Sequence, residues 1–468
     1  MLFSFLIYIN TISSRPLSTR PLNELDDQIS DTSRGIFQTL WFNQTLDHNS
    51  ANSTTFKQKY LVNAQYYKSG GPVFLYIEGE SALRNSSVTN GNMVQLAIEN
   101  NGMIFGLEHR FYGDSQPFDE WTLDNLKYLS SLNGVKDAGN FIKNVINPTT
   151  NKPFKNTKWI TTGGSYAGAL SAWIKEEYPK EVFIGYASSA PVLAKADFYE
   201  YDQVVASALG PQCASEMNSI KNYIDGLFDD KTRFNKLKSD FNCTDVEDDD
   251  LFLYTIADIL AYIVQYNLPT TNPNIDTFCS GLVSQSDMKS KINHYIDQTN
   301  KVRNNNGYTC KSFEGYDTLK AIKANNKDVM KQWTYQSCQE WGFWQTAPKN
   351  GISTRSKRLT LKWFYDYFCS EKFFGKKIGP SDPNITNNYF KALNNSTPRT
   401  LWVNGDADPW HALSVINTQN STLDRPIYLI KNGSHSADLY PDSATDSAPL
   451  TDTRKKIRSD ISRWLKLG

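Results

Sequence analysis

The first part of the chain alternates short apolar runs with segments of helical periodicity. Apolar runs bounded by turn-forming residues are typical of strands buried on both faces, and they occur at 72–77, 103–107, 159–162 and 182–187. Helix-compatible segments at 93–101, 135–145 and 166–178 lie between or after these runs, and Pro179 ends the last of them. Strands that alternate with helices predict a parallel sheet.

The pattern changes in the middle of the chain. Residues 197 to about 395 are mostly helical in pattern, for example at 251–266 and 360–368, with loops rich in Asn and Lys. Strand patterns return at 400–403 and 427–430, and an amphipathic helix pattern covers 452–467. We therefore predict an α/β fold whose core spans 36–195 and 396–468, interrupted by a helical insertion over 196–395.

Length and charge narrow the class of protein. The chain has 468 residues, which suits one large domain with an insertion. Lys plus Arg and Asp plus Glu balance at 49 each, so we expect no electrostatic binding of nucleic acid or of acidic lipid. Aromatic residues make up 13 % of the chain, which favours a folded protein with a large core.

The N-terminus predicts entry into the secretory pathway. Residues 2–9 form an apolar run that is too short for a membrane span, which needs about 20 residues. The run has the length of a signal-peptide core, so residues 1–14 are a candidate signal peptide, although no Lys or Arg precedes it. No other stretch is apolar and long enough to cross a membrane.

Cysteines and glycosylation motifs point the same way. The six cysteines lie within the predicted insertion and include no CxxC pair: Cys213, Cys243, Cys279, Cys310, Cys338 and Cys369. An oxidising compartment would make them disulfides, although the sequence does not choose the pairing. Predicted glycan acceptors are Asn43, Asn52, Asn85, Asn242, Asn384, Asn394, Asn395 and Asn420. A ninth sequon, at Asn432, is predicted to be unused because a glycan there would crowd His435. We predict a secreted or lysosomal protein.

The segment GGSYAG at 163–168 carries the first chemical signal. It lies between a predicted buried strand and a predicted helix, which is the context of an α/β-hydrolase nucleophile. In that context Ser165 occupies a sharp turn, and small neighbours let strand and helix approach. The usual pattern is G-x-S-x-G, whereas here Ala167 stands at the second position after the serine and Gly168 at the third. The alternative is a glycine-rich turn with a capping serine.

The position of the histidines relative to Ser165 reduces the candidates for its base. The chain has five: His48, His109, His294, His411 and His435. In this fold the acid and the histidine follow the serine, and a residue of the insertion is not part of the core. The order therefore leaves His411 and His435.

The loops after the last two strands separate these histidines but not the acids. His435 follows the strand pattern at 427–430, while Asp406 and Asp408 follow the one at 400–403, so both loops leave the same edge of the sheet. His411 is three residues from Asp408, and we interpret it as a loop-packing residue. Spacing alone does not decide between Asp406 and Asp408.

Across nearly its whole length from about residue 40, the chain resembles a known family. The matching segments are FNQTLDH (42–48), GGPVFLYIEG (70–79), EHRFYG (108–113), GGSYAG (163–168), ASSAP (187–191), WTYQSC (333–338), NGDADPW (404–410) and GSH (433–435). In this order they resemble the lysosomal Pro-X carboxypeptidase family of serine peptidases, family S28, which also contains dipeptidyl-peptidase II and the thymus-specific serine protease. SAW at 171–173 and EWGF at 340–343 are most similar to the thymus-specific branch.

The resemblance implies a site and an architecture. It places the catalytic acid at the Asp before Pro-Trp, which is Asp408, beside Ser165 and His435. It also implies an α/β-hydrolase core with a helical cap inserted after residue 195. The oxyanion hole would use the N–H of Tyr166 and a second donor near Gly79.

Known members of this family cut next to proline, close to a chain end. A proline ring needs an aromatic pocket, for which the candidates are Trp333, Tyr335, Trp341 and Trp344, and the alternative for these residues is the core of the cap. We predict a serine exopeptidase that acts on peptides by acyl transfer, with neither a metal nor a cofactor. A carboxylesterase or lipase on the same fold and a non-catalytic binding protein are the alternatives. The end of the peptide that is attacked and the formation of a homodimer stay open.

Overall fold

The protein is built around one large mixed sheet. The structure is a computed structural model that describes residues 36–325 and 329–467. In spatial order the strands are β1 (Gln38–Thr45), β2 (Thr55–Asn63), β4 (Met103–Leu107), β3 (Val73–Ile77), β7 (Trp159–Gly164), β8 (Val182–Ser188), β11 (Thr400–Gly405) and β12 (Ile427–Ile430). β2 runs antiparallel to β1 and β4, and every pair from β4 to β12 is parallel.

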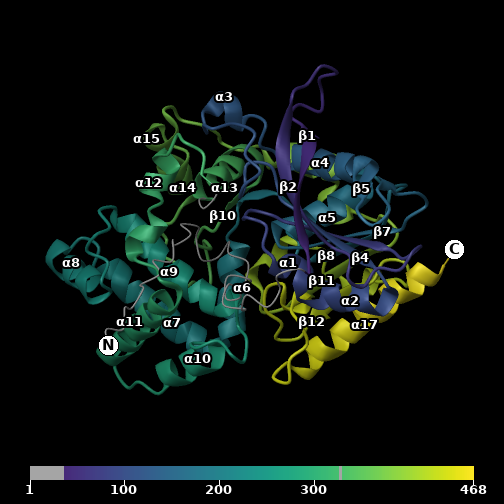
Figure 1. Cartoon of the computed structure of the whole chain (residues 1–468). Helices are drawn as coiled ribbons and strands as arrows, with labels where there is room; N and C mark the ends of the chain where they lie inside the picture. Colours follow the sequence, from purple (N-terminus) through teal and green to yellow (C-terminus); the bar gives the residue numbers. More distant parts are fainter. Residues whose placement is uncertain (1–35, 326–328, 468) are drawn as a thin grey trace, which may run out of the picture.

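Helices cover both faces of this sheet, which confirms the predicted α/β fold with an α/β-hydrolase core (Figure 1). They are α1 (Ser86–Thr89), α2 (Asn92–Asn100), α4 (Ser131–Asn144), α5 (Tyr166–Glu177) and α17 (Ala448–Lys466), while the short helix α3 (Leu123–Leu126) precedes α4 in the chain. Successive strand residues face opposite sides. Leu75 of β3 belongs to the core on the side of α5, which contains Trp173, whereas Phe74 belongs to the core that contains Trp464 of α17.

The antiparallel edge of the sheet was not predicted from the sequence. β1 and β2 contain many polar residues, and β1 is largely exposed, so neither shows the continuous apolar run of a strand buried on both faces. A short second hairpin, β5 (Ile146–Asn147) and β6 (Lys152–Pro153), was also not predicted. The six predicted strands are all present. Five of them are almost fully buried, whereas β12 at the edge of the sheet is half-buried.

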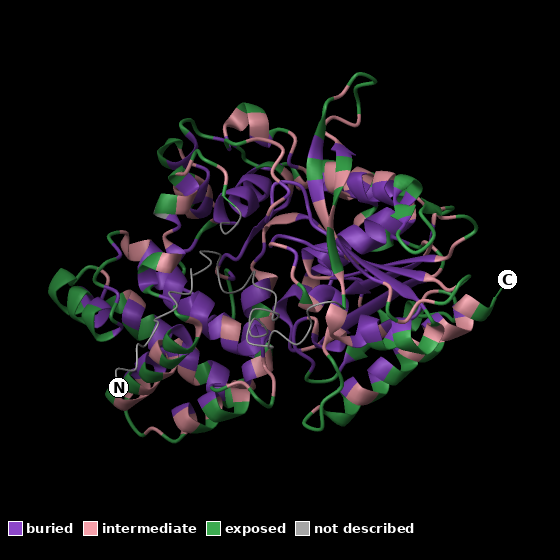
Figure 2. Cartoon of the chain, viewed as in Figure 1, coloured by how far each residue is buried: buried purple, intermediate pink, exposed green. Residues whose placement is uncertain are grey.

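Between β8 and β11 the described chain is mostly helical, and we call residues 196–395 the cap (Figure 1). Its helices are α6 (Glu200–Leu209), α7 (Pro211–Gly226), α8 (Lys231–Asp240), α9 (Asp249–Gln265), α10 (Ile275–Val283), α11 (Met288–Asn306), α12 (Tyr316–Lys320), α13 (Met330–Gln336), α14 (Leu361–Phe368), α15 (Glu371–Phe374) and α16 (Pro383–Phe390). A two-stranded parallel sheet joins β9 (Lys195–Asp197) to β10 (Gly342–Trp344). Helix α9 is buried on nearly all sides, which makes it the central helix of the cap (Figure 2).

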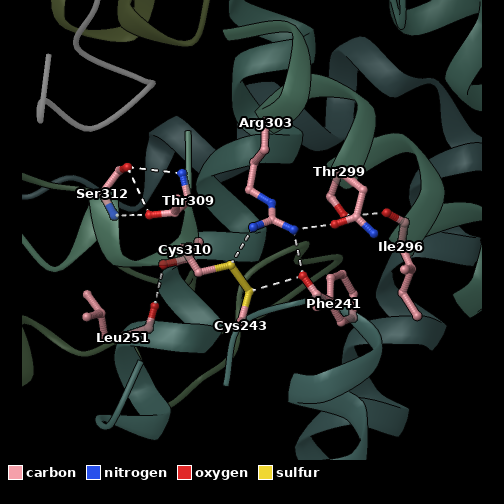
Figure 3. The surroundings of a disulfide bond; sticks show 11 residues. Phe241, Cys243, Leu251, Ile296, Thr299, Arg303, Thr309, Cys310 and Ser312 are labelled. Carbon is pink, nitrogen blue, oxygen red and sulfur yellow. Dashed lines mark hydrogen bonds between the residues drawn. A yellow bond between two sulfur atoms is a disulfide. The ribbon is translucent and has the colours of Figure 1, made fainter. Parts of the chain in front are cut away.

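All six cysteines form disulfides within the cap. The pairs are Cys213–Cys279, Cys243–Cys310 and Cys338–Cys369. Figure 3 shows that the guanidinium of Arg303 lies beside the second pair, where it donates to the Cys310 Sγ atom at 3.0 Å and to the carbonyl of Phe241 at 2.7 Å. The disulfides therefore cross-link helices and loops that are far apart in the sequence.

The candidate signal peptide over residues 1–14 lies outside the described residues. Among the residues that are described, no helix combines the length and the apolar character that a membrane crossing requires.

A buried ion pair fixes the loop after β4 to the edge hairpin and to α4. Arg110 is fully buried and binds Asp137 of α4 with two N–H groups, Nε to Oδ2 at 2.6 Å and Nη2 to Oδ1 at 2.5 Å. The same guanidinium donates to the carbonyls of Thr45 and Leu46, and His48 Nε2 lies 2.7 Å from Asp137 Oδ1. These hydrogen bonds hold the loop that contains Arg110 against the end of β1 and against α4.

We expect the change Asp137→Ala to lower the free energy of unfolding by about 3–5 kcal/mol, because it leaves the Arg110 charge buried without a carboxylate. Urea denaturation measures the change. Asp240→Ala is the matched control, since the Lys236–Asp240 pair is exposed and its loss should cost less than about 1 kcal/mol. Equal losses in the two variants would contradict this account.

Candidate active site

Ser165 occupies a strained turn between β7 and α5. Its φ is 59° and its ψ is −132°, a conformation that L-residues rarely adopt. Two neighbouring glycines allow the close approach of strand and helix. A Cβ atom on Gly163 would lie 2.4 Å from the Ala167 carbonyl oxygen, and one on Gly168 would lie 2.4 Å from the Ser188 carbonyl oxygen. The residue types of this motif are therefore required by packing, including the glycine at the third position after the serine.

His435 pairs with Asp408 and not with Asp406. His435 Nδ1 lies 2.8 Å from Asp408 Oδ2, and both side chains are buried. The other Asp408 oxygen accepts the N–H of Trp410 at 3.0 Å. Asp406 Oδ1 instead accepts the backbone N–H of Asn432 at 2.6 Å, which links the loops after β11 and β12. The structure thus separates two acids that the spacing left equivalent.

Backbone contacts bring the Ser165 turn and the His435 loop together. The Ser165 N–H donates to the Ser188 carbonyl at 3.0 Å, and the N–H of Ser436 donates to Ser189 Oγ at 2.8 Å. A Cβ atom on Gly164 would lie only 2.7 Å from Ser436 Oγ. Among the described residues no hydrogen bond joins the Ser165 hydroxyl to His435, so the two segments are neighbours without a direct bond.

The two residues predicted for the oxyanion hole lie against each other. Tyr166 is the first residue of α5, and the first N–H groups of a helix have no acceptor within the helix. A Cβ atom on Gly79 would lie 3.3 Å from the Ala167 nitrogen and 3.6 Å from Cδ1 of Tyr166. The loop after β3 therefore runs across the start of α5, where the helix dipole favours negative charge.

The four aromatic candidates for a substrate pocket fall into two groups. The rings of Trp341 and Trp333 lie 4.9 Å and 6.1 Å from the ring of Tyr166, and 5.4 Å from each other. Trp344 instead stacks on the rings of α14, and Tyr335 lies against α15. Of these four candidates, only Trp341 and Trp333 adjoin Tyr166, next to the turn of Ser165.

The cap also reaches the hydroxyl group of Tyr166. This hydroxyl accepts from Gln336 Nε2 at 3.2 Å, lies 3.1 Å from His109 Nε2 and donates to Ser131 Oγ at 3.4 Å. The carboxyl group of Glu340 accepts from both the N–H and the hydroxyl of Ser131, at 2.9 Å and 2.5 Å. None of these four residues was predicted as a site residue from the sequence, although Gln336, Glu340 and His109 lie in the segments that carry the resemblance.

Several ionisable groups around the site are held neutral by burial. Desolvation raises the pKa of Glu78, Glu108 and Glu340 from 4.5 to about 7. It lowers the pKa of His109 from 6.5 to about 4. Desolvation also raises the pKa of Tyr166 well above 10. The groups around the Tyr166 hydroxyl are therefore uncharged in mild acid.

The predicted glycan acceptors are exposed with one exception. Asn395 is fully buried, and its Nδ2 donates to Glu176 Oε2 at 2.9 Å, so a glycan at this position is incompatible with the folded structure. The sequon motif does not encode burial, which explains the difference. The other seven predicted acceptors and Asn432 are exposed. Among the described residues no group of three or more His, Cys, Asp or Glu is arranged to hold a metal ion.

We expect the free energy of unfolding to fall as the pH rises from about 4.5 to about 7. In this window Glu78, Glu108 and Glu340 keep their protons in the folded state, whereas the same groups have lost them in the unfolded state. Each of the three glutamates therefore lowers the free energy of unfolding by roughly 3 kcal/mol across the window. His109 opposes this between pH 4 and 6.5, because there the unfolded state binds the extra proton, but it offsets only one of the three.

Urea denaturation over this pH range tests the expectation. The change Glu108→Gln removes one titrating group and should make the decline shallower by roughly 3 kcal/mol. A wild-type stability that increases with pH through this window, or an unchanged slope in the variant, would show that these groups are not buried as described.

Comparisons with known proteins identify the family of the chain. The family model described as serine carboxypeptidase S28 matches residues 44–457. The thymus-specific serine protease of Mus musculus is 31% identical over 453 residues, which cover 91% of this chain and 87% of the relative. The protein named probable serine protease EDA2 of Arabidopsis thaliana is 32% identical over 458 residues, 92% of this chain and 88% of the relative.

A more distant relative carries a more specific name. The probable extracellular serine carboxypeptidase of Arthroderma benhamiae is 25% identical over 463 residues, which cover 88% of this chain and 64% of the relative. The match to the family model covers the cap and the parts of the core that precede and follow it in the chain. The chain therefore belongs to the serine carboxypeptidase S28 family of serine peptidases.

Proposed function

We propose that this chain is a serine exopeptidase that cleaves peptides near a chain end, next to proline, through an acyl-enzyme. The observation that carries the proposal is the buried pair of His435 Nδ1 and Asp408 Oδ2, 2.8 Å apart, beside the strained turn of Ser165. An acid, a histidine and a serine in this arrangement are the parts that acyl transfer requires.

The proposed mechanism assigns one role to each member. Because an ionised carboxylate only accepts hydrogen bonds, Asp408 fixes the proton of His435 on Nδ1 and leaves Nε2 as the base. Nε2 takes the proton of Ser165 as its Oγ attacks the peptide carbonyl, and then protonates the leaving amine. Water repeats the sequence to release the acyl group. The bond from Ser165 to His435 would form on substrate binding, as is common for catalytic hydrogen bonds.

The developing oxyanion would accept from the N–H of Tyr166 and from a donor on the loop at Gly79. Their mutual proximity and the positive end of the α5 dipole support this assignment. Removing one donor of such a hole typically lowers kcat by about 10² to 10³.

Preference for proline would come from the rings of Trp333 and Trp341. They are the predicted pocket residues that lie against Tyr166, directly after the nucleophile. The cap over the site would restrict access to the ends of peptides. The description of the family as serine carboxypeptidases is in keeping with exopeptidase activity.

We further infer that the protein acts in the secretory pathway, either secreted or in lysosomes. Three disulfides favour an oxidising compartment, and one relative is named as extracellular. Seven exposed sequons are available for glycans.

We expect Ser165→Ala to abolish labelling by a fluorophosphonate and to lower kcat by a factor on the order of 10⁴ to 10⁶. Asp408→Asn should lower kcat by about 10⁴, because it favours the wrong tautomer of His435. Asp406→Asn is the matched control from the same loop, and we expect it to lose less than about tenfold. Labelling that persists in Ser165→Ala would refute the proposed nucleophile.

Products from designed peptides test the substrate class. Peptides with one proline near each end should be cut only next to a proline close to a terminus, and mass spectrometry of the products identifies that terminus. Capping the N-terminus or the C-terminus should block cleavage at the capped end alone. Hydrolysis of acyl esters without any peptide cleavage would instead favour a carboxylesterase.

A further inference from the structure

Gln265 of the cap lies between the two loops that carry Asp408 and His435. It is the last residue of α9 and is fully buried. Asp408 and His435 follow different strands, β11 and β12, and are 27 residues apart. Their relative position therefore depends on contacts between the loops and with whatever packs on them.

The backbone of Gln265 holds the His435 loop. The last carbonyl groups of a helix receive no N–H hydrogen bond from within the helix and must find donors elsewhere. The Gln265 carbonyl accepts the N–H of His435 at 2.9 Å. The end of α9 is thus completed by the backbone of the catalytic histidine, and the ring of the next residue, Tyr266, lies edge-on to the His435 ring.

The side chain of Gln265 holds the Asp408 loop. Its Oε1 accepts from Trp410 Nε1 at 3.0 Å and from the Tyr201 hydroxyl at 2.8 Å. Trp410 in turn donates its backbone N–H to Asp408 Oδ1 at 3.0 Å. Aromatic contacts with Tyr201 and Phe198, at 5.7 Å and 5.4 Å between ring centroids, enclose Trp410. One amide oxygen therefore connects α6, α9 and the loop of the acid.

We propose that Gln265 is a positioning residue that sets the Asp408–His435 pair, so that α9 is a fixed part of the active site. This inference rests on the proposed function of that pair. The cap would not open on this side without displacing His435, and substrate would enter on another. Positioning by Gln265 matters for the rate because a displacement of about 1 Å at a catalytic group can cost about 10² in rate.

The experiment replaces the acceptor while keeping the volume. Gln265→Met should lower kcat by about tenfold to a hundredfold, with KM within about twofold of wild type, because substrate contacts stay intact. The rate of fluorophosphonate labelling of Ser165 should fall by the same factor. Gln265→Glu should recover most of the loss, since it keeps the acceptor oxygen, and Nε2 of Gln265 has no hydrogen-bond partner among the described residues.

A double variant tests the specific contact. Tyr201→Phe removes one donor to Gln265. Each kcat is expressed as a fraction of the wild-type value. The fraction for the double variant Tyr201→Phe/Gln265→Met should then exceed the product of the fractions for the two single variants. Gln44→Met is the matched control, because Gln44 is a buried glutamine with several hydrogen bonds at the edge hairpin. It should lower the Tm and leave kcat unchanged.

Three outcomes would overturn the inference: a kcat for Gln265→Met within twofold of wild type, a loss no larger than that of Gln44→Met, or a loss that Gln265→Glu does not relieve. If Gln265→Met fails to fold, Trp410→Phe removes the Nε1 donor instead, and an unchanged kcat there would also overturn the inference.

The proposed function fails separately, when Ser165→Ala stays active. Inactive Ser165→Ala together with fully active Gln265→Met refutes only the role of Gln265.

Discussion

The strained backbone of Ser165 is the constraint on which the site depends. A φ of 59° with a ψ of −132° persists only when the surrounding structure enforces it. Enforcement comes from the close packing of α5 on β7 and β8, where Gly163 and Gly168 leave no room for a Cβ atom. Because that packing also sets the start of α5, it fixes the Tyr166 N–H and the loop at Gly79 beside the serine.

The cap contacts this arrangement from two directions. On one side Gln265 contacts the loops of Asp408 and His435, and on the other Gln336 binds the hydroxyl of Tyr166. Glu340 extends the second contact to Ser131, at the start of α4. Three disulfides cross-link the cap itself, and Cys338–Cys369 anchors the segment between Gln336 and Glu340 to the end of α14. The cap is thus part of the framework of the site as well as its cover.

The burial that builds this framework also sets its charge state. The buried carboxyl groups of Glu78, Glu108 and Glu340 keep their protons to about pH 7, which lets Glu340 sit beside the hydroxyl network of Tyr166 without an uncompensated charge. The buried Arg110–Asp137 pair is the contrasting case, since the guanidinium supplies the compensation and two N–H groups satisfy the carboxylate.

The sequence by itself determined the buried strands, the helices that alternate with them and Ser165 in its turn, because apolar runs and small residues are local signals. It did not determine the exposed edge strands, which lack such a run. Spacing alone did not choose between Asp406 and Asp408; the family resemblance favoured Asp408, and the path of the loop pairs Asp408 with His435. The disulfide pairing, the separation of Trp341 from Trp344 and the contacts of Gln265 were decided only by the tertiary structure. Each joins residues distant in the chain, and pairing at such distances depends on how helices pack, which no local pattern encodes.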